Sequence, residues 1–426
     1  MLFESFKVNS KLEILVQEIE REVKEQLEEF ESISEFNQLK VIKAMQEHKV
    51  CEAHFYGTTG YGYDDLGRDT IDSIYAQVFH SEDALVRTQF VSGTHALNVA
   101  LWSVLRTGDM LVSVTGRPYD TLEEAIGITG GGAGSLIDFG VKYKEIALLE
   151  DGNMDYGSIE RTLRSDMVKM VYIQRSKGYG WRPSLSITEI SKLIEFIKNI
   201  NKSVICVVDN CYGEFVEKQE PTEVGADLVV GSLIKNPGGG LAHTGAYIAG
   251  NKELVRLAAY RLTSPGIGKK CGATLGTNRS ILMGLFFAPH IVCQSLKGAL
   301  LCSALMRKLG HEVSPTPEEP RTDIIQAVKF ADRESVIAFC QGIQKGAAVD
   351  SHVIPQPWDM PGYSNEVIMA AGTFVQGASI EMSADAPIRP PYIAYIQGGL
   401  TYTHAKLSIL MAVQELINRG LLTVNS

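Results

Sequence analysis

The segments Val207-Val-Asp-Asn-Cys-Tyr-Gly-Glu214 and Gly231-Ser-Leu-Ile-Lys-Asn-Pro-Gly-Gly-Gly240 decide the fold of this chain. Both come at the end of an apolar run, so Asp209 closes one predicted strand and Lys235 follows another. Ligands in a mostly parallel sheet bind at the carboxyl ends of the strands. The two segments therefore predict a sheet of this kind, with an acid and a lysine at the same edge.

An acid and a lysine in this arrangement are what pyridoxal phosphate requires of a protein. A lysine, here Lys235, holds the aldehyde of the cofactor as an imine, and a carboxylate, here Asp209, keeps its ring nitrogen protonated. We expect burial and nearby positive charge to lower the pKa of Lys235, as this chemistry requires. The alternatives are a surface loop lysine and, for Asp209, a helix N-cap.

A second predicted feature is a phosphate site, because a phosphate binds the free N–H groups at the start of a helix. Ser92, Gly93 and Thr94 follow a predicted strand and open a predicted helix. Gly93 allows close approach, and the N–H groups of Gly93 and Thr94 can point at the phosphate. Ser232 can reach the same phosphate, since the chain must bend there to present Lys235. The alternatives are a turn of small residues without a ligand and a buried turn serine.

Tyr119, within Gly116-Arg-Pro-Tyr-Asp120, follows another predicted strand. A flat aromatic ring can stack on the pyridine ring of the cofactor, and a tyrosine hydroxyl can move protons. We therefore expect Tyr119 to contact the cofactor and to take part in catalysis. The alternative is a tyrosine packed in a turn that contains proline.

The chain around these segments alternates between strand-like and helix-like stretches from about residue 72 to residue 260. Continuous apolar strands between amphipathic helices indicate an α/β fold with a mostly parallel sheet that is covered on both faces. The predicted strands are Ala84–Val91, Met110–Val114, Met167–Gln174, Val204–Val208, Leu228–Gly231 and Gly245–Ala249. The predicted helices are His95–Leu105, Leu122–Ile128 and Ile187–Ile200.

The whole pattern predicts an N-terminal helical arm (1–50), a large cofactor-binding domain (51–300) and a smaller α+β C-terminal domain (301–426). The arm is helical from Ser10 to about Glu47, because its apolar residues recur every three to four positions. A long apolar helix from Ala273 to about Lys308 leads to the small domain. The predicted elements of the small domain are a strand Asp323–Phe330 and helices Arg333–Gln344 and Tyr402–Asn418.

Composition narrows the class of protein. The chain has 426 residues and a formal net charge of −10, which makes it a poor candidate for binding nucleic acids or anionic membranes. Its seven cysteines form no CxxC pair, and its first residues lack the pattern of a signal peptide. We therefore expect a cytoplasmic enzyme with no membrane span and no metal site. A solvated helix face explains Glu214 and Glu217 better than a pair of metal ligands.

Three short motifs resemble the fold-type I pyridoxal-phosphate enzymes of the cystathionine and methionine lyase class. They are the ring-acid turn Asp209-Asn-Cys-Tyr212, the lysine segment Ser232-Leu-Ile-Lys235 and the phosphate turn Ser92-Gly-Thr94. Other stretches resemble one branch of this class, the bacterial methionine gamma-lyase-like family often labelled "aluminium resistance protein". These stretches are Arg117-Pro-Tyr-Asp-Thr-Leu122, Gln174-Arg-Ser-Lys-Gly-Tyr-Gly-Trp-Arg-Pro183 and Ile396-Gln-Gly-Gly-Leu-Thr-Tyr402.

This resemblance implies a large domain around a seven-stranded sheet, a smaller C-terminal domain, and a homodimer or homotetramer with shared active sites. It also implies that Tyr63 reaches the phosphate of the neighbouring subunit. Asp65 takes the place of an arginine that makes the same contact in the lyases, and Arg68 is the alternative for that contact. Cys211 replaces a threonine beside the cofactor ring, and Ile234 replaces a phosphate-binding threonine.

The implied activity is elimination at the β- or γ-carbon of a sulfur-containing amino acid, with Lys235 as the base and Tyr119 as the general acid. The lyases bind the substrate carboxylate through an arginine at the position of Tyr395. Arg389 is our candidate for this contact, and Arg175 and Arg321 are alternatives. Other hypotheses are an aminotransferase-like reaction on the same fold, a different phosphate-binding enzyme, and a non-catalytic stress or metal-resistance protein that retains the cofactor.

Overall fold

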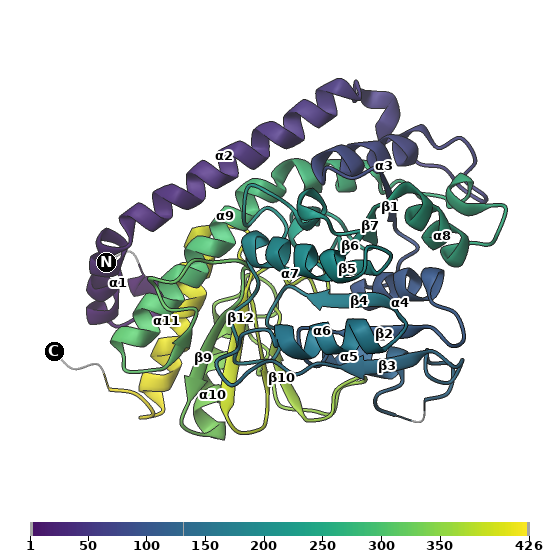
Figure 1. Ribbon diagram of the computed structural model, residues 1–426. Helices are drawn as coiled ribbons and strands as arrows, with labels where there is room; N and C mark the ends of the chain where they lie inside the picture. Colours follow the sequence, from purple (N-terminus) through teal and green to yellow (C-terminus); the bar gives the residue numbers. More distant parts are fainter. Residues whose placement is uncertain (1–2, 131, 424–426) are drawn as a thin grey trace.

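The computed structural model describes residues 3–130 and 132–423, and these residues form two sheets with helices packed around them (Figure 1). The chain starts with two helices, α1 (Ser10–Glu22) and α2 (Lys24–Glu47), and α2 packs along the later helix α9 (Asn278–Lys308). The sequence predicts a helical arm from Ser10 to about Glu47, without a break at a particular residue. Instead the arm divides at Val23, whose backbone (φ −96°, ψ 17°) leaves the helical region.

Within the described residues the central sheet has seven strands in the order β1-β7-β6-β5-β4-β2-β3. β7 pairs antiparallel with β1 and β6, and the other neighbouring strands pair in parallel. The predicted α/β fold with a mostly parallel seven-stranded sheet is therefore confirmed. The strands are β1 (Asp83–Arg87), β2 (Met110–Ser113), β3 (Lys142–Glu145), β4 (Val168–Gln174), β5 (Ile205–Asp209), β6 (Leu228–Ser232) and β7 (Ala246–Gly250).

Two strands at the margins of the sheet differ from the prediction. β1 ends at Arg87 rather than Val91, because its pairing with β7 ends there, and Val91 is exposed to solvent. β3 has no counterpart among the predicted strands. Its sequence Lys142-Tyr-Lys-Glu145 is charged, as is typical of an edge strand that faces solvent, so a search for apolar runs does not find it.

The alternation of side chains along β4 divides the core into two layers. Val171 and Ile173 pack in the layer that also holds α3, α6, α7 and α9, whereas Met170 and Tyr172 pack in the layer that holds α4, α5 and α8. Helices therefore cover both faces of the sheet, as the sequence predicts. These helices are α3 (Leu66–Val78), α4 (Gly93–Val104), α5 (Asp120–Ile126), α6 (Tyr156–Ser165), α7 (Ile187–Ile200) and α8 (Lys252–Leu262).

The second sheet follows α9 and has, in the described part of the chain, five antiparallel strands in the order β10-β11-β12-β9-β8. The strands are β8 (Val313–Ser314), β9 (Gln326–Phe330), β10 (Val367–Ala370), β11 (Ser383–Pro387) and β12 (Tyr392–Gln397). Helices α10 (Arg333–Lys345) and α11 (Tyr402–Asn418) pack against each other, and both agree with the predicted helices to within one residue. The domain boundaries at residues 50 and 300 stay a prediction, and the second of them falls inside α9.

α9 is long and apolar enough to cross a membrane by length and composition, with a mean hydropathy of 1.4 in its most apolar window. In the protein, 67% of that window is buried, and the helix packs against α1, α2 and α11. Burial of this kind is typical of a helix in the core of a globular protein.

A close contact joins α9 to the segment that carries Lys235. The short helix η4 (Asn236–Gly238) follows Lys235, and a Cβ atom on Gly284 of α9 would stand 2.2 Å from the carbonyl oxygen of Gly238. Because no carbon and oxygen approach this closely without a bond, the contact requires glycine at this position of the helix. The backbone of α9 thereby supports the backbone that presents Lys235.

Gly284→Ala should lower the free energy of unfolding by about 1–3 kcal/mol, because the added methyl group forces α9 away from η4. Gly157→Ala is the matched control, since Gly157 also lies in a helix and the nearest atom to its Cβ would be Asp155 Oδ1 at an ordinary 3.4 Å. The control should gain up to about 1 kcal/mol, because alanine favours a helix over glycine. Urea denaturation measures both changes, and an unchanged or raised free energy of unfolding in Gly284→Ala would contradict the close contact.

Candidate active site

A cavity of about 350 Å³, which we call the site cavity, opens at the carboxyl ends of β5 and β6. Its walls come from both sheets. Asp209 and Ser232 are the last residues of β5 and β6, whereas Asp385 of β11 and Gln397 of β12 come from the second sheet. The cavity therefore lies where the rule for parallel sheets places a ligand, and the second sheet encloses it.

Most residues that the sequence predicts at the cofactor line this cavity. They are Ser92, Gly93, Thr94, Tyr119, Asp209, Cys211, Ser232 and Lys235. Tyr63 and Arg389 do not line it. The structure therefore brings the predicted ring acid, cofactor lysine and phosphate turn together from distant parts of the chain.

Two hydrogen bonds hold the carboxylate of Asp209. The hydroxyl of Tyr172, from β4, donates to Asp209 Oδ2 (3.1 Å), and the N–H of Cys211 donates to Oδ1 (3.1 Å). Burial, together with the charge of Asp209, raises the pKa of Tyr172 well above its ordinary value, so Tyr172 keeps its proton. A carboxylate has about four acceptor sites, so Asp209 can accept a further N–H from the cavity, such as that of a protonated pyridine ring.

Lys235 follows β6, and its Nζ lies 4.1 Å from the centre of the Tyr212 ring. Burial lowers the pKa of Lys235, but the acidic groups of Cys211, Tyr212 and Asp209 raise it by more, so the pKa lies above its ordinary value. The expected lowering of this pKa is therefore wrong, because the neighbouring groups are acids rather than cations. Lys235 must lose a proton before it can bond to an aldehyde.

The start of α4 fits a phosphate group. Ser92 caps the helix, since its Oγ accepts a hydrogen bond from the N–H of His95 (3.0 Å). In the described residues no hydrogen bond uses the N–H of Gly93 or Thr94. A Cβ on Gly93 would lie 3.3 Å from the Cβ of Ser232, so a larger residue would narrow the space beside the free N–H groups. Free donors at a helix start next to a serine hydroxyl are what a phosphate binds.

Tyr119 lies in the cavity wall with a fixed orientation. Its N–H donates to Gln174 Oε1 (2.8 Å), and its hydroxyl lies 3.0 Å from the hydroxyl of Tyr363. The rings of Tyr179 and Tyr363 lie 5.4 and 6.2 Å from that of Tyr119, measured between centroids. Burial raises the pKa of Tyr119 well above its ordinary value, so its phenol is a proton donor at neutral pH.

A buried arginine holds the turn that follows Asp209. Arg175 donates to Asn210 Oδ1 (2.8 Å) and to the carbonyl oxygen of Gly213 (2.9 Å), and it pairs with Glu217 (2.6 Å). Because these contacts occupy Arg175 and it does not line the site cavity, its role is to hold the turn. Tyr212, within the turn, has a φ of 74°, a left-handed conformation that is strained for a residue other than glycine.

The prediction that Glu214 and Glu217 lie on a solvated helix face is wrong. Glu214 is fully buried and accepts a hydrogen bond from the Tyr247 hydroxyl (3.0 Å), and burial raises its pKa to about 8. The chain forms a turn rather than a helix here, and Arg175 supplies a partner for Glu217 that the local sequence does not reveal. Among the described residues, no group of three or more His, Cys, Asp or Glu side chains could hold a metal ion.

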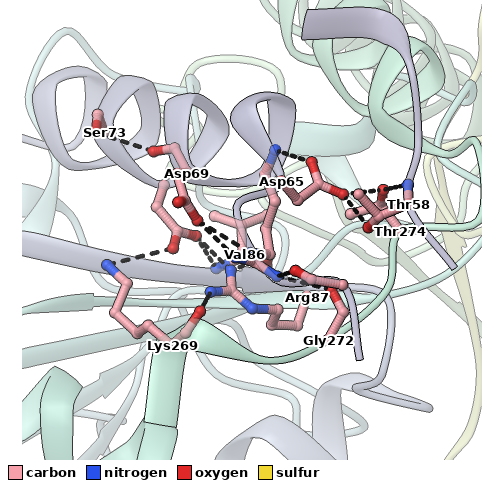
Figure 2. A network of polar contacts seen from close by, with 12 residues as sticks. Thr58, Asp65, Asp69, Ser73, Val86, Arg87, Lys269, Gly272 and Thr274 are labelled. Carbon is pink, nitrogen blue, oxygen red and sulfur yellow. Dashed lines mark hydrogen bonds and ion pairs between the residues drawn. The ribbon is translucent and has the colours of Figure 1, made fainter. Parts of the chain in front are cut away.

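Tyr63 lies on an exposed loop before α3, with its ring stacked on that of Tyr61 (5.5 Å between centroids). A polar network fixes this loop, because Asp65 accepts hydrogen bonds from the hydroxyls of Thr58 (2.5 Å) and Thr274 (2.6 Å) (Figure 2). Although burial acts to raise the pKa of Asp65, these hydrogen bonds lower it, so the carboxylate stays charged. Tyr63 is therefore presented outward on a loop of defined shape.

Arg68, the alternative for the missing phosphate arginine, is buried in the same network. Its Nη1 donates to the carbonyl oxygens of Gly62 (2.5 Å) and Gly272 (3.1 Å), and its Nη2 pairs with Asp69 (3.0 Å). The side chain points into the loop rather than outward. Arg68 therefore supports the loop that carries Tyr63.

The arginines considered for the substrate carboxylate lie outside the site cavity. Arg389 lines a neighbouring cavity that shares Tyr119 and Gln174 with the site cavity, and its Nη1 donates to Asn365 Oδ1 (3.1 Å). Arg321 is buried and does not line the site cavity. The substrate role of Arg389 stays a prediction.

Asp385 is a residue of the cavity that the sequence analysis did not single out. Its Oδ2 accepts a hydrogen bond from Gln397 Nε2 (3.1 Å), and burial raises its pKa to about 6. The local sequence Ser383-Ala-Asp-Ala-Pro387 carries no motif, and only the packing of the second sheet over the central sheet brings Asp385 to the cavity.

The chain matches known proteins along almost its whole length. The methionine gamma-lyase family matches it over residues 12–417. YnbB of Bacillus subtilis (strain 168), an uncharacterised protein, is 51% identical over 422 residues, which are 99% of this chain and 100% of that protein. A crystal structure from Clostridium novyi NT, described as a carbon–sulfur lyase involved in aluminium resistance, has a TM-score of 0.94 and 51% identity and covers 97% of this chain and 98% of that one.

A more distant relative is an L-methionine gamma-lyase of Fusobacterium nucleatum subsp. polymorphum, 26% identical over 217 residues, or 51% of this chain and 49% of that protein. These matches confirm the predicted resemblance and the fold-type I architecture. They also confirm pyridoxal phosphate, the cofactor of the family, which the residues of the site cavity fit. The chain belongs to the methionine gamma-lyase family.

Proposed function

We propose that this protein is a cytoplasmic, pyridoxal-phosphate-dependent carbon–sulfur lyase that eliminates the sulfur substituent from the β- or γ-carbon of a sulfur-containing amino acid. The observation that carries the proposal is that Lys235 and Asp209 line one cavity together with the free N–H groups at the start of α4. Family membership supports lyase chemistry, as does the likeness to the structure described as a carbon–sulfur lyase.

The residues that line the site cavity suit each part of the cofactor. When bound, pyridoxal phosphate supplies an electron sink that makes the α-proton of an amino acid acidic. Asp209 would accept the N–H of the pyridine ring, and Lys235 would hold the aldehyde carbon. Of the other residues that line the cavity, Ser92, Gly93, Thr94 and Ser232 would hold the phosphate, and Tyr119 and Cys211 would lie beside the ring.

Two residues move the protons of the elimination. The amine of Lys235, once it has lost its own proton, takes the α-proton of the substrate. Tyr119 donates a proton to the leaving sulfur, since burial keeps its phenol protonated at neutral pH, and its hydroxyl lies 3.0 Å from that of Tyr363. The Cα–H and C–S bonds break, the sulfur leaves as a thiol, and one water molecule converts the remaining skeleton into a keto acid and ammonia.

We also propose that the protein forms a homodimer or homotetramer in which Tyr63 of one subunit binds the phosphate in the site cavity of another. Tyr63 lies outside the site cavity of its own chain and is 57% exposed, although its loop is fixed by the network around Asp65. An exposed aromatic side chain on an ordered loop is suited to a contact with a second copy of the chain.

Lys235→Ala should abolish the visible absorbance of the purified protein and the release of keto acid, because no amine remains to bond with the aldehyde. Lys177→Ala is the control, since Lys177 is also buried and burial lowers its pKa to about 8, but it donates to the carbonyl oxygen of Ser314 (2.9 Å) and does not line the site cavity. The control should keep the visible band. A visible band that persists in Lys235→Ala would overturn the assignment of the cofactor lysine.

Ser232→Ala should raise the Kd for pyridoxal phosphate by about tenfold, because one hydrogen bond to a charged phosphate is lost. Ser103→Ala is the control: Ser103 is equally buried, but it donates to the carbonyl oxygen of Ala100 (2.7 Å) within α4. Fluorescence titration of the cofactor-free variants measures both constants. An unchanged Kd in Ser232→Ala would remove this serine from the phosphate site.

Mixing Tyr63→Ala with Lys235→Ala should restore about a quarter of the wild-type activity, although each variant alone loses most of it. Half of the re-formed dimers are mixed, and one of the two sites in each mixed dimer carries neither change. Tyr119→Phe mixed with Lys235→Ala is the control, because both residues line the same cavity and every mixed site keeps one defect. If the first mixture stays as inactive as the control, Tyr63 does not act across a subunit interface.

A further inference from the structure

Asp385 is a charged residue of the site cavity to which the elimination assigns no role. Among the described residues, the charged side chains that line the cavity are Asp209, Lys235 and Asp385, and no arginine or histidine joins them. The proposed function assigns Asp209 and Lys235 to binding of the cofactor. The wall that the second sheet contributes therefore carries one charge, and that charge is negative.

The carboxylate of Asp385 is oriented but not saturated. Gln397 Nε2 donates to Asp385 Oδ2 (3.1 Å) and also to Ser383 Oγ (3.1 Å), which fixes the amide between the two side chains. The Tyr179 hydroxyl also acts on this carboxylate as a donor and, like Gln397, lowers its pKa, so about half of its roughly four acceptor sites remain available. Because burial raises the pKa of Asp385 only to about 6, the group is mainly ionised at neutral pH.

Aromatic side chains lie near Asp385: burial, together with the charge of Asp385, raises the pKa of both Tyr363 and Tyr179. Tyr363 and Tyr119 both line it, with their hydroxyls 3.0 Å apart and their rings in an edge arrangement. The ring of Tyr179 lies 6.0 Å from that of Tyr363. A carboxylate beside aromatic rings is the chemistry that binds an ammonium group, through an ion pair and through cation–π attraction.

We infer that Asp385 and Tyr363 form a subsite for a positively charged nitrogen at the far end of the substrate. The inference rests on the proposed function in one respect, that the substrate is an amino acid. It specifies the substrate class, an amino acid that carries a second ammonium group beyond the bond that breaks. A carboxylate in the same place would be repelled by the charge of Asp385, although the charge of Lys235 also reaches this part of the cavity.

The position of Asp385 also defines an orientation for the substrate. Arg389 lines the neighbouring cavity, which shares Tyr119, Gln174 and Gly178 with the site cavity. A carboxylate is expected towards that side, and a cation towards Asp385. Electrostatic complementarity of this kind sets specificity, because a substrate with a positive end is attracted and a substrate with a negative end is repelled.

The test uses the holoenzyme and two amino acids of similar shape, L-lysine and L-norleucine, which lack a leaving group and differ in the terminal ammonium. Each is titrated against the visible absorbance of the cofactor, which reports binding without turnover. Wild type should bind lysine at least about tenfold more tightly than norleucine, and Asp385→Asn should reduce this ratio to within about threefold. Tyr363→Leu, which removes the aromatic face, should also reduce the ratio.

Asp359→Asn is the matched control. Asp359 precedes Met360, which lines the site cavity, but it is itself exposed and does not line it. The same loss of charge at Asp359 should leave the ratio of the two Kd values unchanged. A wild-type protein that binds norleucine as tightly as lysine would overturn the inference, and so would a ratio that is equal in wild type and Asp385→Asn.

A second measurement separates the subsite from the proposed reaction. S-(2-aminoethyl)-L-cysteine and S-propyl-L-cysteine have the same length, and release of keto acid is followed for both. If neither is cleaved but lysine binding still depends on Asp385, the subsite stands and the lyase proposal fails for these substrates. If both are cleaved at equal kcat/KM, the lyase proposal stands and the subsite is refuted.

Discussion

The parallel pairing of β5 with β6 sets the positions of Asp209 and Lys235. Asp209 pairs with Val230, and Ser232 ends β6 two residues later, so the acid and the lysine segment leave the sheet at the same edge. A slip of one residue would turn the side chains of one strand to the opposite faces. Val207 and Val208 oppose such a slip, because each is fully buried in a different layer of the core.

Buried ion pairs stabilise the turn that follows β5 at this edge of the sheet. Arg175 is fully buried, and it contacts Glu217 (2.6 Å) and Glu220 (3.9 Å) below the turn that carries Tyr212. Removing one partner of a buried pair costs about 3–5 kcal/mol, since it leaves a charge without compensation. The turn next to the cofactor site is therefore maintained by polar contacts, whereas the strands that lead to it are maintained by apolar packing.

The sequence predicts the half of the site that follows from local patterns. Asp209 and Lys235 stand at the ends of apolar runs, and buried parallel strands produce such runs because both of their faces are covered. Asp385 is different, because its place in the cavity depends on how the second sheet packs over the first. The direction of the pKa shift of Lys235 and the burial of Glu214 likewise depend on neighbours that meet only in the folded chain. Neither can be predicted from the local sequence.

The left-handed backbone of Tyr212 has a consequence for the evolution of this protein. Glycine would adopt a φ of 74° without the strain, of about 1–3 kcal/mol, that another residue bears there. Glycine would also remove the ring that lies 4.1 Å from Lys235 Nζ. Selection for thermal stability alone would favour glycine at this position, whereas selection for a defined environment of the lysine favours tyrosine. At position 212, the residue that gives the higher stability therefore differs from the residue that shapes the surroundings of Lys235.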